Sequence, residues 1–183
     1  MKIENIIRRV LREEQEEEKL LKIPGIRYFN NDWNILQKFL ESQGYPRYSI
    51  GGDLDLRDSD VKSLGNLVRV EGDLDLYYSD VESLGDLEYV GGDLNLIDTD
   101  IETLGKLERV EGFLTLESCQ NLESLGDLEY VGKWLDIKHT NVESLGNLKY
   151  VGSHLFLRYT PLSEKYTGKQ IRKIVEVVGG VYL

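Results

Sequence analysis

A unit of about twenty residues is repeated along the middle of this chain, and this repetition restricts the possible folds more than any other feature. The consensus is V-x-G-x-L-x-L-x-x-S/T-x-V/I-x-S/T-L-G-x-L-x-x, and successive copies lie 20 residues apart except for one spacing of 21. The six copies begin at Ile50, Val70, Val90, Val110, Val131 and Val151. One copy is too short to bury its own leucines, whereas stacked copies bury them against each other. The repeats therefore predict a solenoid.

Each unit contains one clear strand signal. The leucines of the L-x-L segment alternate with polar residues, which is typical of a short strand with one face turned to the core. The leucine–glycine pair further along suits a turn that needs a positive φ. No part of the unit has the length or the 3.6-residue period of a helix. We therefore expect one short parallel strand per unit, about 4.8 Å from its neighbours.

The segment L-x-L-x-x-S/T-x-V/I resembles the strand half of a leucine-rich repeat, L-x-x-L-x-L-x-x-N/C-x-L. It is also similar to the β-helical L domains of receptor ectodomains. The N/C position of the motif is taken by Ser59, Ser79, Thr99, Cys119, Thr140 and Thr160. The units differ from the family pattern in three ways. Ser or Thr replaces Asn at nearly every N/C position, the first leucine is displaced by one residue, and the units lack a convex helix. The resemblance implies a mainly β fold, a right-handed leucine-rich-repeat-like parallel β-solenoid of about six coils with helical caps at both ends.

The two ends of the chain differ from the repeats and are expected to cap the solenoid, because an open end exposes unpaired strands. We expect one continuous domain with an N-terminal helical cap over 1–47, the solenoid over 48–162 and a C-terminal cap over 163–183. Apolar stripes predict N-terminal helices over 3–21 and 32–43, the first of which could instead bind a partner helix. The buried face of the second is expected to hold Trp33, Ile35, Leu36, Phe39 and Leu40. At the other end, residues 168–178 are predicted to be helical and GGVYL to form a short strand.

Composition and charge exclude several classes of protein. No apolar run approaches the ~20 residues that span a membrane, and the glutamate-rich N-terminus is not a secretory signal. The single cysteine, Cys119, allows no internal disulfide. The net charge is −11 overall, and residues 50–160 hold 23 acidic and 9 basic residues. An acidic body of this kind disfavours nucleic-acid binding, so we expect a cytoplasmic protein with neither nucleic-acid nor membrane partners.

Side chains that point outward from the predicted strands form four columns, one residue per unit. The first column is Asp53, Asp73, Asp93, Phe113, Trp134 and His154. The second is Asp55, Asp75, Asn95, Thr115, Asp136 and Phe156. The third is Arg57, Tyr77, Ile97, Glu117, Lys138 and Arg158, and the fourth is Asp58, Tyr78, Asp98, Ser118, His139 and Tyr159. Along the stack the surface thus changes from carboxylates to aromatic rings.

The columns supply the candidate binding residues. An exposed aromatic patch is typical of a protein interface, and a tyrosine pair amid acids suits a partner with arginine or lysine. The candidates are Asp53, Asp73, Asp75, Asp93, Tyr77, Tyr78, Phe113, Trp134, His139, Phe156 and Tyr159. Two alternatives stay open, namely that the acids form a merely solvated sheet and that the C-terminal segment or a sister subunit covers the aromatic rings. Outward-splayed carboxylates rarely converge on Ca²⁺, so no metal or cofactor is expected.

No sequence motif of an enzyme is present. Cys119 occupies the inward Ser/Thr position and is expected to be a buried small side chain rather than a nucleophile paired with His139. The hypothesis is therefore a non-catalytic module that binds another protein through its strand face. The alternatives are a structural or virion assembly component, an acidic nucleic-acid mimic that inhibits a DNA-binding host protein and a carbohydrate-binding protein. The oligomeric state stays open.

The ends of the chain carry a second resemblance. The opening IIRRVLREE and the closing IRKIVEVVGGVYL are similar to the ends of uncharacterised phage-encoded proteins. This resemblance implies a virion component or an early gene product, located in the host cytoplasm or in the virion.

Overall fold

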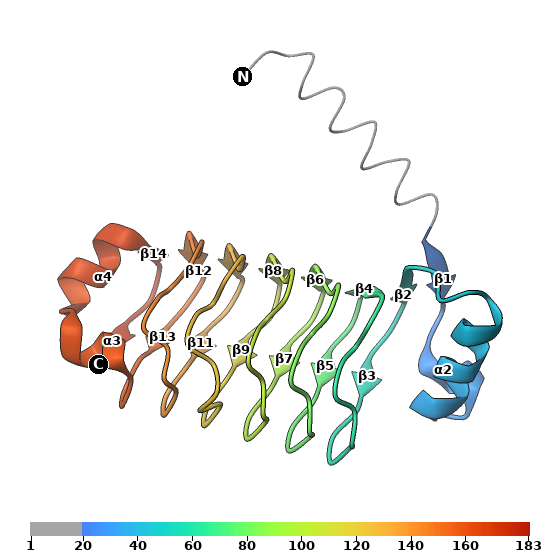
Figure 1. The fold of residues 1–183 in the computed structure, drawn as a ribbon. Coiled ribbons are helices and arrows are strands. Elements are labelled where there is room, and N and C mark those ends of the chain that lie inside the picture. The colour runs from blue at the N-terminus through green and yellow to red at the C-terminus, as the bar shows by residue number, and fades with distance from the viewer. Residues whose placement is uncertain (1–19) are drawn as a thin grey trace, which may run out of the picture.

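The structure, a computed structural model, describes residues 20–183 and shows a mainly β, parallel β-solenoid of about five turns (Figure 1). The helix predicted over 3–21 lies outside the described residues, apart from its last two positions. One sheet has eight parallel strands in the order β1 (Leu21–Ile23), β2 (Tyr48–Ile50), β4 (Leu67–Val70), β6 (Tyr89–Val90), β8 (Arg109–Val110), β10 (Tyr130–Val131), β12 (Tyr150–Val151) and β14 (Glu176–Val177). The other has seven in the order β3 (Leu54–Asp55), β5 (Leu74–Asp75), β7 (Leu94–Asn95), β9 (Leu114–Thr115), β11 (Leu135–Asp136), β13 (Leu155–Phe156) and β15 (Val181–Tyr182).

Each unit therefore contributes two strands, and the expectation of one strand per unit was wrong. The predicted L-x-L strand is present as the seven-stranded sheet. The second strand comes from the dipeptide that ends in the first valine of the consensus, as in Tyr89–Val90. Its aromatic and β-branched residues favour strands, and the following glycine turns the chain into the next strand. A third side of the coil is held by parallel bridges, such as that between Ser83 and Thr103.

The core lies between the sheets and consists of stacked aliphatic residues, one from each coil. The paired leucines of the seven-stranded sheet, for example Leu94 and Leu96, are fully buried. The Ser/Thr position also faces inward, and each hydroxyl donates to the carbonyl three residues earlier, as Ser79 does to Leu76 at 2.7 Å. Cys119 lies in this column with no exposed surface. Its burial raises the pKa of the thiol, which disfavours the reactive thiolate.

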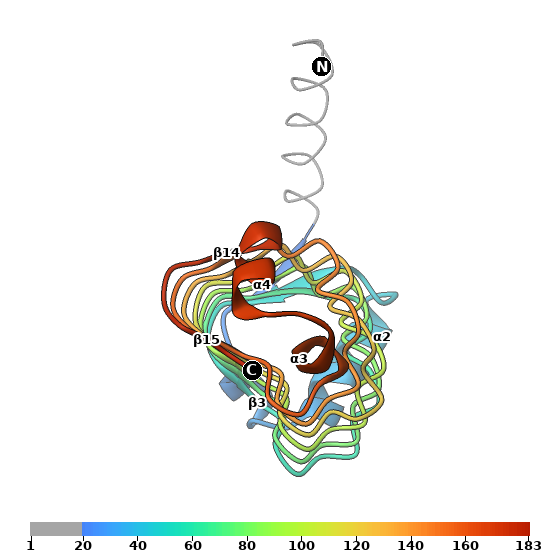
Figure 2. The ribbon, with the colours of Figure 1, turned by 90° about the vertical axis from the view of Figure 1, so that its left-hand side faces the viewer.

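Helices occupy both ends of the stack (Figure 1). The 3-10 helix η1 (Ile26–Phe29) and helix α2 (Trp33–Ser42) lie beside β1, and the side chain of Asp32 caps α2. Viewed along the stack, α3 (Pro161–Lys165) and α4 (Gly168–Ile174) lie across the C-terminal end (Figure 2). No helix formed by residues 20–183 is long and apolar enough to cross a membrane.

Two details of these helices differ from the sequence predictions. Ile35 and Phe39 of α2 are 41% and 36% exposed, so the buried face is narrower than the apolar stripe and centres on Leu36 and Leu40. Helix α4 ends at Ile174 and not at Val178, because residues 176–177 form β14 and pair with β12. The predicted final strand is present as β15, which pairs with β13.

Candidate functional site

The outer face of the seven-stranded sheet and the turn that follows each of its strands carry the predicted site residues. We call residues 50–109 the acidic coils, since they hold 16 acidic and 5 basic residues. Residues 110–183 are called the aromatic coils. The two regions share strand register, because Leu94 of β7 pairs with Leu114 of β9 where they meet. The four columns can therefore be compared position by position.

In the acidic coils the first column is a hydrogen-bonded ladder. The Oδ1 atom of Asp53 accepts the backbone N–H of Asp73 at 2.9 Å, and Asp73 accepts that of Asp93 at 2.8 Å. The last rung runs from Asp93 to the N–H of Phe113 at 2.9 Å. Each carboxylate thus satisfies a backbone donor of the next coil. These aspartates are part of the scaffold, and one oxygen of each is already occupied.

The ladder also explains a glycine of the repeat. A Cβ on Gly92 would lie 2.0 Å from Oδ1 of Asp73, which is closer than real contacts allow. Gly72, Gly92 and Gly112 therefore each leave room for the carboxylate that reaches over from the previous coil. Glycine and aspartate recur together because they form one structural device.

The second column has a local backbone role. The side chains of Asp55, Asp75, Asn95 and Asp136 each accept the N–H two residues ahead, at 3.0–3.2 Å. Such a bond is an Asx turn and ends the strand. Arg57 adds two side-chain hydrogen bonds to Asp55, at 2.9 and 2.7 Å, and holds the pKa of that carboxyl below its usual value. The acidic face is thus bonded within itself.

The fourth column lies in the turn, and all its residues have positive φ. Asp, Asn and Gly tolerate this left-handed conformation best, whereas a bulky residue is strained there. Tyr78 and Tyr159 nevertheless adopt it, with φ of 54° and 60°, and their side chains are 64% and 72% exposed. The fold itself gives no reason for a tyrosine at either position.

The aromatic coils bring most of the predicted rings into contact. Phe113 and Trp134 stack with centroids 4.6 Å apart and planes at 9°. His139 and Tyr159 stack at 4.5 Å and 19°. In the acidic coils only Tyr77 and Tyr78 meet, at 6.1 Å, and both are exposed.

Two further rings, which the sequence analysis did not select, complete this cluster. Tyr182 stacks on Phe156 at 4.9 Å and 14°, and the centroids of the His154 and Tyr182 rings lie 5.6 Å apart with their planes at 69°. The Nδ1 atom of His154 accepts the N–H of Gly180 at 2.8 Å, so it does for β15 what the aspartates do for other coils. The tail therefore covers Phe156, as one alternative anticipated, and it adds a ring of its own. The available signal was V-V-G-G-V-Y-L at the C-terminus, which matches V-x-G-x-L-x-L except for Val181.

A half-buried ion cluster lies in the second and third columns of the aromatic coils. Lys138 contacts Asp136 and Glu117, in both cases at 3.2 Å. Burial raises the pKa of Asp136, and hydrogen bonds from Lys138 only partly oppose this. The cluster links the second and third columns across two neighbouring coils.

The eight-stranded sheet carries another column that the sequence analysis missed. Its outward residues in register are Lys22, Ser49, Arg69, Tyr89, Arg109, Tyr130, Tyr150 and Glu176. The Arg69 guanidinium lies 4.1 Å from the centroid of Tyr89, and that of Arg109 lies 3.6 Å from Tyr130. Alternating Arg-Val and Tyr-Val dipeptides at spacings of 20 or 21 residues, from Arg69 to Tyr130, were the signal for this cation–π stack.

Across residues 20–183, no three His, Cys, Asp or Glu side chains are grouped so that they could hold a metal ion. Comparisons with protein-family models, with curated proteins and with solved structures found no match to the chain.

Proposed function

We propose that this protein is a non-catalytic protein-binding module. Its contact surface consists of Tyr77 and Tyr78 together with the rings on the seven-stranded side of the aromatic coils, which are Phe113, Trp134, His139, Phe156, Tyr159 and Tyr182. The observation that carries the proposal is the exposure of Tyr78 and Tyr159 in left-handed turns where the fold favours Asp or Asn. Residues kept against local conformational preference are often functional. Exposed aromatic residues are also enriched among the side chains that dominate protein interfaces.

The surface matches one kind of partner best. The rings project from a sheet whose backbone N–H groups are hydrogen-bonded from coil to coil. The surface is therefore rigid before binding, and little conformational entropy is lost when a partner binds. Carboxylates surround Tyr77 and Tyr78, and Arg57 is the cation nearest in the same column. An arginine or lysine of a partner would find both a ring face and negative charge there. We therefore expect a protein partner with basic residues.

The repeats supply substitutions that test this surface without harming the fold. Tyr78→Asn and Tyr159→Asn place an uncharged residue that tolerates positive φ, so stability should be unchanged or higher. Affinity capture with quantitative mass spectrometry should then lose the partner that wild-type protein retains. Trp134→Ala should weaken the same capture, while Tyr28→Ala is the control, because Tyr28 is 64% exposed but belongs to η1. Equal recovery of one partner by wild type and both asparagine variants would refute this surface.

A structural or virion assembly role is the second candidate. Strands β14 and β15 are the last of their sheets. The Arg172 guanidinium donates to the carbonyls of Val177 and Gly179 at β14, so the outer edge of β15 is the candidate for pairing. Ile174, Val178 and Leu183 lie near this end and are 55%, 63% and 40% exposed. The test is the solution mass by light scattering at low and moderate salt, where an oligomer that Val178→Lys converts to monomer would favour assembly.

The nucleic-acid mimic is less well supported. Such a mimic presents free carboxylates in the pattern of phosphates, whereas the aspartates of the first two columns bond to backbone N–H groups. If the protein were such a mimic, it would inhibit a DNA-binding protein. The triple change of Asp53, Asp73 and Asp75 to Asn would then abolish this inhibition.

The finer points of architecture and setting belong to the same proposal. We propose a right-handed, leucine-rich-repeat-like coil, with α2 at one end and α3 and α4 at the other acting as caps. Residues 157–175, which contain α3 and α4, connect β13 to β14 and would close a sixth coil. A phage origin, with the protein in the host cytoplasm or the virion, accords with the resemblance of the chain ends.

A further inference from the structure

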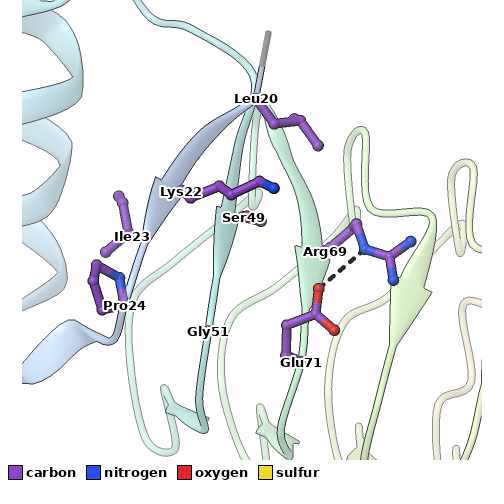
Figure 3. A pocket seen from close by; sticks show the side chains of 8 residues that line it. All are labelled: Leu20, Lys22, Ile23, Pro24, Ser49, Gly51, Arg69 and Glu71. Carbon is purple, nitrogen blue, oxygen red and sulfur yellow. Dashed lines mark hydrogen bonds and ion pairs between the residues drawn. The ribbon is translucent and has the colours of Figure 1, made fainter. Parts of the chain in front are cut away.

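A shallow hollow of about 280 Å³ lies on the eight-stranded sheet, away from the aromatic coils (Figure 3). It follows strand β2, whose outward residues there are Ser49 and Gly51, while large side chains rise from the strands on either side. Lys22 and Pro24 come from the β1 side and Arg69 and Glu71 from the β4 side. Because two strand spacings separate β1 from β4, the walls are about 9.6 Å apart at their base. The hollow is thus one missing rung of the outward column.

The same sheet shows what a filled rung looks like. Tyr89 occupies the equivalent position on β6, between Arg69 and Arg109 in strand register. The Arg69 guanidinium stacks on the Tyr89 ring from one side. Its side chain also lines the hollow over Ser49, which is 7% exposed and forms the floor. A flat ring placed over Ser49 would extend the alternation of cation and ring by one step.

The charge of the hollow differs from that of the whole protein. Its lining contains two cations, Lys22 and Arg69, and one carboxylate, Glu71. Glu71 is bonded to Nε of Arg69 at 3.1 Å, so the Lys22 ammonium is the excess charge. Leu20 and Pro24 supply apolar surface at the rim. A positive, partly apolar hollow on a chain of net charge −11 is suited to an anion that also has a flat apolar part.

The geometry points to a binding site for a small planar aromatic carboxylate. Its ring lies over Ser49 against Arg69, and its carboxylate pairs with the Lys22 ammonium. The volume is close to the lower limit of ligand pockets, about 300 Å³, so the ligand has one ring rather than several. This site is on the other sheet and is independent of the protein-binding surface proposed above.

The probe for the test is 4-hydroxyphenylacetate, titrated into the full chain by calorimetry or by amide chemical shifts. We expect saturable binding with a dissociation constant of about 1 mM or tighter. Cyclohexylacetate has the charge but no aromatic face and should bind at least about tenfold more weakly. Benzyl alcohol has the ring but no charge, and its binding should be weaker than that of 4-hydroxyphenylacetate by a similar factor.

Variants locate the site. Lys22→Gln and Arg69→Gln should each weaken binding about tenfold, and Ser49→Tyr should abolish it by filling the rung with the residue that β6 carries at the equivalent position. The matched control is Arg109→Gln, which loses the equivalent stack on Tyr130 and the ion pair with Glu111 but should bind as wild type does. Thermal unfolding by circular dichroism shows which variants keep the fold, and Lys22 is exposed enough for its change to be tolerated. No saturable binding by the wild type, or wild-type affinity in both Lys22→Gln and Arg69→Gln, would overturn the proposal.

Discussion

The acidic coils and the aromatic coils have the same backbone but use the first column of the seven-stranded sheet differently. In the acidic coils Asp53, Asp73 and Asp93 each reach forward and bond the next coil. In the aromatic coils the column continues as Phe113 and Trp134, which contact each other through their ring faces. The same geometric position therefore serves the scaffold in one half and presents apolar surface in the other.

This difference shows how a repeat protein can acquire a site. The repeated geometry of the coil comes from the inward leucines and the strand pairing, which both halves share. Once these hold the backbone, the outward column can lose its aspartates without losing the fold. His154 combines the two uses of the column, because it lies among the rings of the aromatic coils and still accepts the N–H of Gly180 from the next coil. Backbone bonding thus accounts for the aspartates of the first two columns in the acidic coils, whereas the rings have no such explanation.

The largest expected effect tests the part that the two halves share. Leu94 and Leu135 occupy equivalent, fully buried positions in β7 and β11. Leu94→Ala and Leu135→Ala should each lower the free energy of unfolding by about 2–5 kcal/mol, since both leave a cavity. Urea unfolding followed by circular dichroism measures this. If one variant were nearly neutral, the halves would not share a core and the comparison would fail.

A smaller effect tests the ladder. Asp73→Ala removes the acceptor of the Asp93 N–H and should cost about 1 kcal/mol. Asp73→Asn retains an oxygen in the same place and should lie within about 0.5 kcal/mol of wild type. Asp60→Ala is the control, because it removes one exposed charge outside the ladder. Equal destabilisation by the alanine and asparagine variants would mean that charge, and not the hydrogen bond, accounts for Asp73.

The features predictable from the sequence were those that the repeat states directly. The L-x-L segments predicted the seven-stranded sheet, its inward leucines and the buried Ser/Thr position, because a period of two has one meaning for a half-buried strand. The helix over 32–43 was also found, with its cap at Asp32. Cys119 is buried as its place in the column implied.

The features that were missed depend on contacts between coils. A two-residue strand such as Arg109–Val110 has no alternation to detect, so the eight-stranded sheet and its cation–π stack did not emerge. The bonds of Asp53 and Asp73 link residues 20 apart, and only the strand register reveals that stacked carboxylates serve backbone donors. Helix α4 was predicted too long because Val175 and Glu176 have apolar and charged side chains that fit a helix, while sheet pairing draws them into β14.

The smallest effect concerns two carboxyls at the same place in the second column. Asp55, in the acidic coils, has a side chain that is 58% exposed and paired with Arg57, which lowers its pKa. Asp136, in the aromatic coils, is 14% exposed, and burial raises its pKa. Carboxyl chemical shifts followed by NMR as pH falls should therefore show Asp136 protonating before Asp55.

The effects of the two carboxyls on stability have opposite signs. Because the pKa of Asp55 is lowered in the folded state, its stabilising contribution is present above the unfolded-state pKa and is lost as pH falls through the folded-state pKa. Because the pKa of Asp136 is raised, its ionisation destabilises the fold as pH rises from the unfolded-state pKa through the folded-state pKa. Arg57→Gln should raise the pKa of Asp55 toward its ordinary value, and Lys138→Gln should raise that of Asp136 further. If the two carboxyls titrated together, the aromatic coils would not bury this column more deeply than the acidic coils do.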